Sequence, residues 1–205
     1  MNAADIYYQR TKRSGLYNIT AIENLPSIIS HGILSYEAAS KIPHISVALQ
    51  TVQDRRDQKT VPNGLRLHQY ANLYFDPRNP MMYRRQSESD HLCILKVTID
   101  VLTYPDVVVS DQNAASKYAA FYDPEYGVGF IDFDLVFKRN WSSPDQIQHW
   151  KNSAAKCAEV LVPGRIEYKD VVAIAAATEA AKMAVLRHDV QVPVYVKPDL
   201  FFRRD

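Results

Sequence analysis

Apolar and polar residues alternate with period two in several short segments, and other segments repeat their apolar residues at helical spacing. The first pattern is typical of strands and the second of helices. The predicted strands are residues 16–20, 92–99, 107–109, 131–137, 158–162, 171–175 and 191–196. The predicted helices are residues 24–31, 114–121, 144–156 and 178–188. This order indicates an α+β domain with short mixed strands.

Two of the helices also have clear end signals. Asn24 is a suitable cap for the first, Pro26 occupies its first turn, and Gly32 ends it. The third helix follows the tetrapeptide Ser-Pro-Asp-Gln at 143–146, which we interpret as a capping box with proline at the first helical position. The starts of both helices are therefore predicted with some precision.

The strand 158–162 contains one acidic residue among apolar ones and ends in a Pro-Gly turn. In an alternating strand, Glu159 and Leu161 share one face, whereas Ala158, Val160 and Val162 share the other. The acid therefore either faces solvent or lines a cleft. An exposed edge position is the ordinary interpretation, because glutamate is mostly exposed in folded proteins.

Length and composition favour one globular domain over residues 1–205, with 47% hydrophobic and 23% charged residues. The net charge of +1 gives no global nucleic-acid signature, so any DNA site must be a local patch. No segment resembles a secretion signal, and no run reaches the roughly 18 apolar residues that span a bilayer. We expect a cytoplasmic protein without a membrane partner.

The cysteines, histidines and glycines exclude several kinds of site. Cys93 and Cys157 belong to no ligand or redox motif, so we expect buried free thiols, and we expect no metal. The chain has only 6 glycines and neither a Rossmann nor a P-loop fingerprint. If NAD binds, we expect it in a cleft between small sheets.

Five segments carry a family resemblance. Residues 16–34 resemble the strand and helix that hold NAD in ADP-ribosyltransferases, in which a later strand carries a glutamate. With the segments 52–56 (Val-Gln-Asp-Arg-Arg), 61–64 (Val-Pro-Asn-Gly), 67–70 (Leu-His-Gln-Tyr) and 73–83 (beginning Leu-Tyr-Phe-Asp-Pro-Arg), the chain resembles the DarT family of DNA ADP-ribosyltransferase toxins. The resemblance extends over nearly the whole chain, through Glu159.

The resemblance implies an ADP-ribosyltransferase-like fold, in which two small mixed or antiparallel sheets form an NAD cleft with flanking helices. It implies an NAD-dependent enzyme that transfers ADP-ribose to a base of single-stranded DNA, with thymine favoured and guanine next. It further implies a toxin restrained by an antitoxin with ADP-ribosyl-glycohydrolase activity. The alternatives are an inactive nucleotide-binding or nucleic-acid-binding member of the fold, and transfer to protein or RNA.

The resemblance also assigns roles to individual residues. Glu159 is the predicted catalytic carboxylate; it would stabilise positive charge on the ribose, and we expect it at a cleft mouth, not deeply buried. Arg56 is the second catalytic residue, unless it is a surface charge paired with an adjacent aspartate. The predicted NAD-binding residues are Asn18, Thr20, Asn24, Tyr74 and Arg56. The predicted DNA-binding residues are Arg55, His68, Arg84, Lys138, Arg139 and Trp141.

Several of these positions have ordinary alternatives or depart from the family. Tyr74 is equally consistent with a core aromatic, and a lone histidine such as His68 is more often structural. The family often has histidine where this chain has Asn18, and a Ser-Asp-x-His element appears here with Asn113. Residues 122–156, just before the glutamate strand, hold many aromatic and cationic residues, and we predict that they bind unpaired bases.

Overall fold

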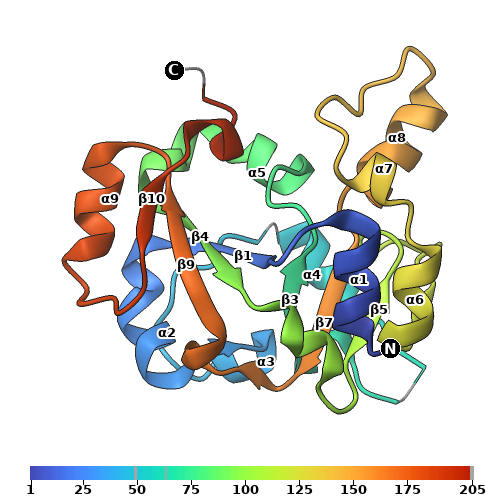
Figure 1. The fold of residues 1–205 in the computed structure, drawn as a ribbon, viewed down its shortest axis with the longest axis horizontal. Helices are drawn as coiled ribbons and strands as arrows, with labels where there is room; N and C mark the ends of the chain where they lie inside the picture. Colours follow the sequence, from blue (N-terminus) through green and yellow to red (C-terminus); the bar gives the residue numbers. More distant parts are fainter. Residues whose placement is uncertain (49, 63, 204–205) are drawn as a thin grey trace.

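An eight-stranded sheet forms the centre of the computed structural model, which describes residues 1–48, 50–62 and 64–203 (Figure 1). Its strand order is β10-β9-β4-β1-β3-β7-β5-β6. The strands are β1 (Leu16–Ala21), β3 (Tyr70–Tyr74), β4 (Leu92–Val97), β5 (Val108–Ser110), β6 (Phe121–Tyr122), β7 (Glu159–Pro163), β9 (Val171–Ala176) and β10 (Val194–Val196). A separate antiparallel pair consists of β2 (Ile33–Leu34) and β8 (Arg165–Ile166).

The large sheet has two halves. Strand β1 pairs with β4 along its whole length, from Leu16 to Ala21, but with β3 only at Tyr17 and Tyr74. Strands β10, β9, β4 and β1 therefore form one half, and β3, β7, β5 and β6 form the other. All pairings are antiparallel except that of β9 with β10. This division agrees with the two small mixed or antiparallel sheets that we predicted.

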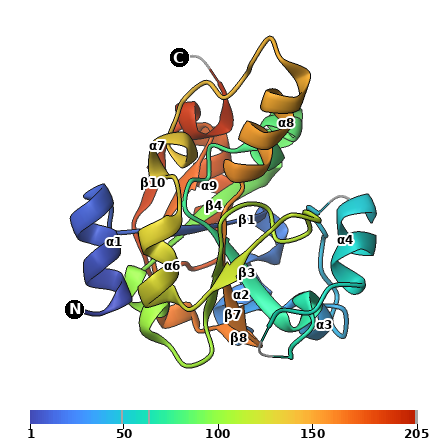
Figure 2. The same cartoon turned by 90° about the vertical axis from the view of Figure 1, so that its right-hand side faces the viewer.

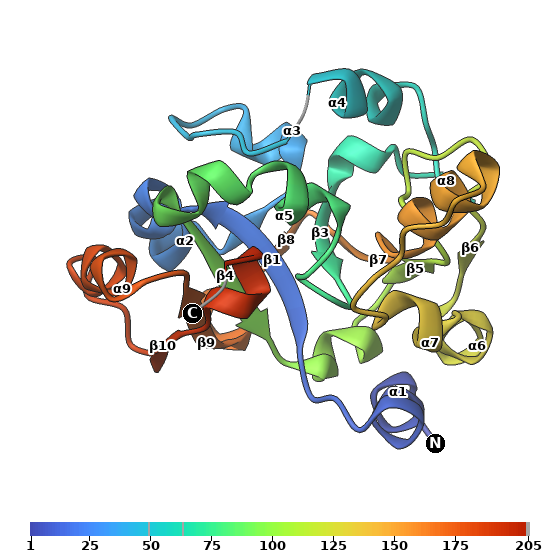
Figure 3. The same cartoon turned by 90° about the horizontal axis from the view of Figure 1, so that it is seen from above.

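Helices surround both halves. They are α1 (Ala3–Thr11), α2 (Leu25–His31), α3 (Tyr36–Ala39), α4 (Gln50–Asp57), α5 (Pro80–Arg84), α6 (Pro124–Phe130), α7 (Phe133–Val136), α8 (Gln146–Ala155) and α9 (Glu179–Leu186). Figures 2 and 3 show α3 and α4 on one side of the molecule, with α1 and α6 on the opposite side. Within the described residues, no helix is long and apolar enough to cross a membrane.

Strand β7 is covered on both faces. Ala158, Val160 and Val162 belong to the largest apolar cluster, whereas Leu161 belongs to a smaller one with Leu67 and other residues near α4. The alternation predicted for this strand is therefore confirmed. The face that Leu161 shares with Glu159 packs against protein, so the ordinary interpretation of an exposed edge position is wrong.

Most predicted elements are present, and two are wrong. Residues 131–137 were predicted as a strand but contain helix α7, which Asp132 caps by accepting the backbone N–H of Leu135 at 3.0 Å. Residues 114–121 were predicted as a helix but form turns that lead into β6. The sequence patterns also missed helices α1, α3, α4, α5 and α6.

The caps of helices α2 and α8 differ in part from the predicted ones. Helix α2 begins at Leu25, but the side chain of Asn24 does not cap it and bonds elsewhere. Gly32 ends α2 with φ of +80°, and a Cβ at this position would lie 2.2 Å from the carbonyl oxygen of Ile166, so only glycine fits. Helix α8 begins at Gln146, and Asp145 is its cap, in place of the predicted capping box.

Candidate active site

A buried ion pair joins Glu159, the first residue of β7, to Arg56 of α4. The Oε2 atom of Glu159 lies 2.9 Å from Nη1 of Arg56, and Oε1 accepts the backbone N–H of Ala114 at 3.0 Å. Glu159 is 0% exposed and Arg56 6%. The expectation of a carboxylate at a cleft mouth is thus wrong: two charge-assisted contacts offset the loss of hydration and hold the acid in its buried position.

The ordinary alternative for Arg56, a surface charge paired with a neighbouring aspartate, is also wrong. Its partner is 103 positions away in the sequence. The adjacent Arg55 is exposed and donates through Nε to the carbonyl of Thr51 at 3.1 Å. Of these two consecutive arginines, only Arg56 contacts the acid, and its role in transfer stays a prediction.

Glu159 lies in the middle of three paired strands. Its register partners are Tyr74 on β3 and Ser110 on β5, and Tyr74 is the residue that pairs with Tyr17 across the two halves of the sheet. Directly opposed residues on paired strands project from the same face. Tyr74 and Glu159 are thus neighbours on one face, and burial, followed by the charge of Glu159, raises the pKa of the Tyr74 phenol.

Three of the predicted NAD-binding residues line one cavity. Asn18, Thr20 and Asn24 surround a cavity of about 160 Å³ together with residues of α2, α3 and the segment 42–48. The Nδ2 atom of Asn24 donates to Thr20 Oγ1 at 3.1 Å and to the carbonyl of Ile45 at 2.8 Å. Its Oδ1 accepts the backbone N–H of Ile45 at 2.9 Å. The cavity therefore has polar amide and hydroxyl groups on its wall.

Helix α4 connects this cavity to the ion pair. Gln53 lines the cavity, and Arg56, one turn later on the same helix, contacts Glu159. Asn18 also lines it and donates to the carbonyl of Asn72 on β3 at 3.2 Å. The predicted cofactor residues and the predicted acid thus belong to one continuous region where the two sheet halves meet.

The predicted DNA-binding residues do not form a single cluster. Lys138 and Arg139 are exposed after α7, and Trp141 is half-buried against Tyr83 and Phe202. Arg84 is exposed at the end of α5, so it belongs to the same general region as Tyr83. Their role in binding DNA stays a prediction.

His68 lies elsewhere. It is buried, with Nε2 3.0 Å from Oε1 of Gln53 and Nδ1 3.3 Å from Asp57, and its ring lies 4.3 Å from that of Tyr36. These contacts connect it to α4 and α3. Its contacts are therefore with the protein, and they support the placement of the helix that carries Arg56.

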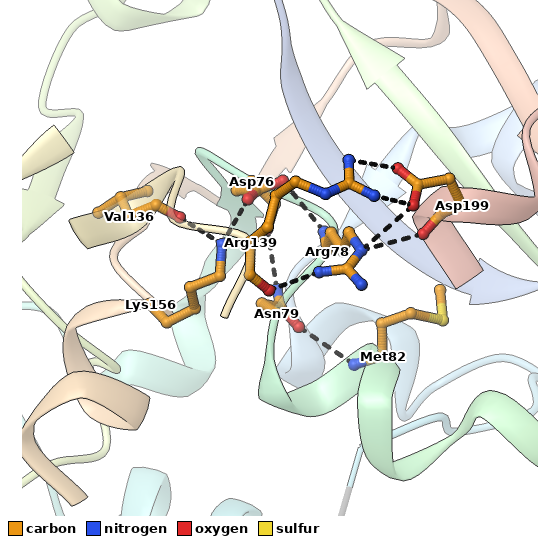
Figure 4. A network of polar contacts seen from close by, with 8 residues as sticks. All are labelled: Asp76, Arg78, Asn79, Met82, Val136, Arg139, Lys156 and Asp199. Atoms are coloured by element: carbon orange, nitrogen blue, oxygen red, sulfur yellow. Dashed lines mark hydrogen bonds and ion pairs between the residues drawn. The ribbon is translucent and has the colours of Figure 1, made fainter. Parts of the chain in front are cut away.

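A second buried ion pair was not anticipated from the sequence (Figure 4). Lys156, 0% exposed, donates to Asp76 Oδ2 at 2.6 Å and to the carbonyl of Val136 at 2.5 Å. Burial lowers the pKa of this lysine, and the aspartate opposes that shift. The pair ties the end of α8 to the loop after β3 and to α7.

The same network reaches the C-terminal segment. Arg139 forms a two-pronged contact with Asp199, and Arg78 donates to the backbone carbonyls of Arg139 at 2.7 Å and of Asp199 at 3.1 Å. The segment between α7 and α8, which holds the predicted DNA-binding residues Lys138, Arg139 and Trp141, is thereby fixed against the loop after β3 and the C-terminal segment (Figure 4).

The thiols and histidines give no sign of a metal site. Cys93 and Cys157 are free and buried, as predicted. Burial raises the pKa of Cys157 to about 12, and the nearby charge of Glu159 acts in the same direction. Among the residues that the structure describes, no group of three or more histidine, cysteine, aspartate or glutamate side chains could hold a metal ion.

Comparison with known families shows which family the chain belongs to. A family model described as ssDNA thymidine ADP-ribosyltransferase, DarT, matches residues 17–202. The chain belongs to the DarT family of DNA ADP-ribosyltransferases. This match includes both members of the Arg56–Glu159 pair, and it confirms the resemblance, the fold and the enzyme class predicted from the sequence. Asn63, part of one of the motifs that carry the resemblance, lies outside the described residues.

Individual DarT relatives match across most of the chain. A DNA ADP-ribosyl transferase of Thermus sp. (strain 2.9) is 26% identical over 202 residues, which cover 93% of this chain and 94% of the relative. A DNA ADP-ribosyl transferase–DNA ADP-ribosyl glycohydrolase fusion protein of Thermosipho africanus is 28% identical over 201 residues. That match covers 91% of this chain and 49% of the relative, so the chain spans about half the length of the fusion protein.

Solved DarT structures share the fold. Thermus sp. 2.9 DarT in complex with ADP-ribosylated ssDNA superimposes with a TM-score of 0.81 at 22% identity and covers 92% of this chain and 96% of that chain. Thermosipho africanus DarTG in complex with ADP-ribose superimposes with a TM-score of 0.78 at 27% identity, covering 93% of this chain and 51% of that chain.

Proposed function

We propose that this DarT protein transfers ADP-ribose from NAD to thymine in single-stranded DNA and acts as the toxin of a toxin–antitoxin pair. The observation that supports this most directly is the buried Arg56–Glu159 ion pair beside the cavity of Asn18, Thr20 and Asn24. The family description, which names single-stranded DNA and thymidine, supports the acceptor. The complexes of Thermus sp. 2.9 DarT with NAD+ and with ADP-ribosylated ssDNA support the donor and the strand.

The chemistry requires breakage of the bond between nicotinamide and ribose. Positive charge develops on the ribose as neutral nicotinamide leaves, and a carboxylate beside the 2′-hydroxyl stabilises that charge more in the transition state than in the ground state. We assign this role to Glu159. The Arg56 guanidinium and the Ala114 N–H both donate to the carboxylate and fix its orientation.

The acceptor would be a ring nitrogen of the base. A thymine imide nitrogen becomes a good nucleophile as its proton passes to solvent. The base then carries negative charge until its nitrogen forms the new bond to the ribose carbon that nicotinamide has left. Arginine is protonated at any physiological pH, so Arg56 would stabilise the developing base anion or the NAD pyrophosphate and would not act as a free base. Asn18, Thr20, Asn24 and Tyr74 would position NAD.

One relative supports the proposal of an antitoxin partner. The Thermosipho fusion protein joins the transferase to a DNA ADP-ribosyl glycohydrolase, an activity that opposes the modification. We propose that a glycohydrolase of this kind is the antitoxin of the present chain. We further propose that the protein acts in the cytoplasm, as expected from the sequence.

Incubation with labelled NAD and separate pools of single-stranded DNA, duplex DNA, RNA and protein tests the proposal. Label should enter single-stranded DNA, and a set of four oligonucleotides that each lack one base should show dependence on thymine. Dependence on guanine would instead place the chain in a different branch. Label in RNA or protein alone, or in no pool, would refute the proposed acceptor.

A further inference from the structure

Lys59 connects the helix of the catalytic arginine to the turn that contacts the catalytic glutamate. It follows Arg56 by three positions, just beyond the end of α4, and is half-buried. Its Nζ atom donates to the backbone carbonyl of Ser116 and lies 5.0 Å from the centre of the Phe121 ring. The backbone of Lys59 is itself fixed, because its carbonyl accepts the N–H of Leu67 at 2.9 Å and its N–H bonds to Arg56.

The turn that Lys59 contacts also provides a donor to the acid. Residues 113–116 form a tight turn in which the N–H of Ser116 donates to the carbonyl of Asn113 at 2.8 Å. The N–H of Ala114, inside this turn, donates to Glu159. The N–H of Asn113 donates to the carbonyl of Ala154 on α8 at 2.9 Å. The turn therefore faces α4 through Ser116 and β7 through Ala114.

These contacts form a closed ring. From Arg56 the ring passes to Glu159, then through Ala114 and the turn to Ser116, and through Lys59 back to α4. Apart from Lys59, the polar contacts that link α4 to the turn within the described residues run through Arg56 and Glu159. Without the Lys59 contact, the turn would be held near α4 by that ion pair and by the packing of Ala114 with Val61 and Leu67.

The charges around Lys59 suit a positioning role. Burial lowers its pKa, the charges of Glu159 and Asp111 oppose that shift, and Arg56 reinforces it. An ammonium group in this place is compatible with the site because a carboxylate lies nearby to balance it. The ammonium group also lies over the Phe121 ring of β6, so a cation–π contact adds to its link with the segment that follows the turn.

We propose that Lys59 is a positioning residue for ADP-ribosyl transfer: it fixes the turn 113–116 against α4, so that Ala114 and Arg56 together hold Glu159 in its reactive position. This inference rests on the proposed function of Glu159 and Arg56. Lys59 acts through those residues, and its loss should therefore slow every reaction that uses Glu159.

The test compares Lys59→Met and Lys59→Arg with Lys117→Met as the matched control, because Lys117 is an exposed cation that directly follows Ser116, the residue that Lys59 contacts. NAD affinity, NAD hydrolysis without DNA, and the kcat and KM of transfer to a thymine oligonucleotide are measured. Lys59→Met should lower kcat of both reactions about 10- to 100-fold, the scale of a small misplacement of catalytic groups. The NAD Kd and the KM for DNA should stay within about threefold of wild type, since neither ligand contacts Lys59 in a positioning role. Lys59→Arg should restore most of the rate, and Lys117→Met should match wild type.

Three outcomes would overturn the inference. Lys59→Met could behave like Lys117→Met, or it could change only the KM for DNA and the salt dependence, which would make Lys59 a phosphate contact. Lys59→Arg could also be as slow as Lys59→Met. If Lys59→Met does not fold, Lys59→Ala, which also removes the donor to Ser116, replaces it with the same expected results. A wild-type chain that hydrolyses NAD but modifies no DNA would refute the proposed acceptor, while hydrolysis would still test Lys59.

Discussion

Replacement of Glu159 by glutamine separates the electrostatic role of the acid from its shape. The structure surrounds the carboxylate with two donors, Arg56 Nη1 at 2.9 Å and the Ala114 N–H at 3.0 Å. A glutamine side chain offers one acceptor oxygen and one NH2 group, so one of these donors must face another donor. The variant also leaves the guanidinium, 6% exposed as part of Arg56, without a counter-charge.

The expected loss of stability is large. Removal of one partner of a buried ion pair typically costs about 3–5 kcal/mol, against a total of about 5–15 kcal/mol for a folded domain. For a chain of this size, each kcal/mol lowers Tm by about 2–4 °C, so Glu159→Gln should melt roughly 6–20 °C below wild type. Glu37→Gln is the matched control, because Glu37 pairs with Arg66 at 3.3 Å with both side chains exposed. It should cost at most about 1 kcal/mol.

Two assays test the variant. Thermal unfolding gives its Tm, and transfer of labelled ADP-ribose to single-stranded DNA gives its activity at a temperature where the variant is folded. Transfer should fall at least about a hundredfold, while NAD binding stays within about tenfold, because the amide keeps the shape of the acid and loses its charge. A Tm equal to that of Glu37→Gln would refute the argument from the buried pair. Transfer near the wild-type rate would remove Glu159 from the catalytic role.

Further predictions address the residues around the acid. Arg56→Ala should reduce transfer at least about a hundredfold, whereas Arg55→Ala should cost much less; reversed effects in the same assay would assign the site to the exposed arginine. Lys156→Met leaves a carboxylate buried and unpaired, so thermal or denaturant unfolding should show a loss of about 3–5 kcal/mol, against little change for the exposed Lys138→Met; equal stabilities would contradict this. Cys157, with its pKa raised to about 12, should resist a thiol reagent at pH 8 until the chain unfolds, and rapid labelling of the native protein would disprove its burial.

The pattern of the chain predicted the strands better than the short helices. Strands β1, β4, β7 and β9 are short, mostly apolar runs and pair over five or six residues. The failure at 131–137 has a physical cause: Ile-Asp-Phe-Asp-Leu-Val-Phe alternates like a strand, but the fold places one helical turn there, capped by Asp132. A helix of four residues is too short to show helical periodicity.

The site was predictable only in part. The family motifs indicated Glu159 and Arg56, and they were needed to choose between two adjacent arginines that composition cannot distinguish. The Ala114 donor is a backbone N–H, which leaves no trace in the side-chain pattern. The pairing of Lys156 with Asp76 joins residues 80 positions apart, and a lysine at the end of an amphipathic helix is normally solvated, so nothing local predicted its burial.

The burial of the Arg56–Glu159 pair is itself an argument about function. A well-packed pair of apolar side chains in such a position is often as stabilising as a buried ion pair, or more so, so the fold alone gives little reason to retain these charges. A transferase has a reason, because an acid that is ionised and already oriented needs no reorganisation when charge develops on the ribose. The contacts with Arg56 and Ala114 use two of the roughly four acceptor positions of a carboxylate. Two acceptor positions are therefore left for a ribose hydroxyl. Because Glu159 is 0% exposed, a neighbouring group must move before NAD reaches the acid, while the contacts with Arg56 and Ala114 would continue to orient it during transfer.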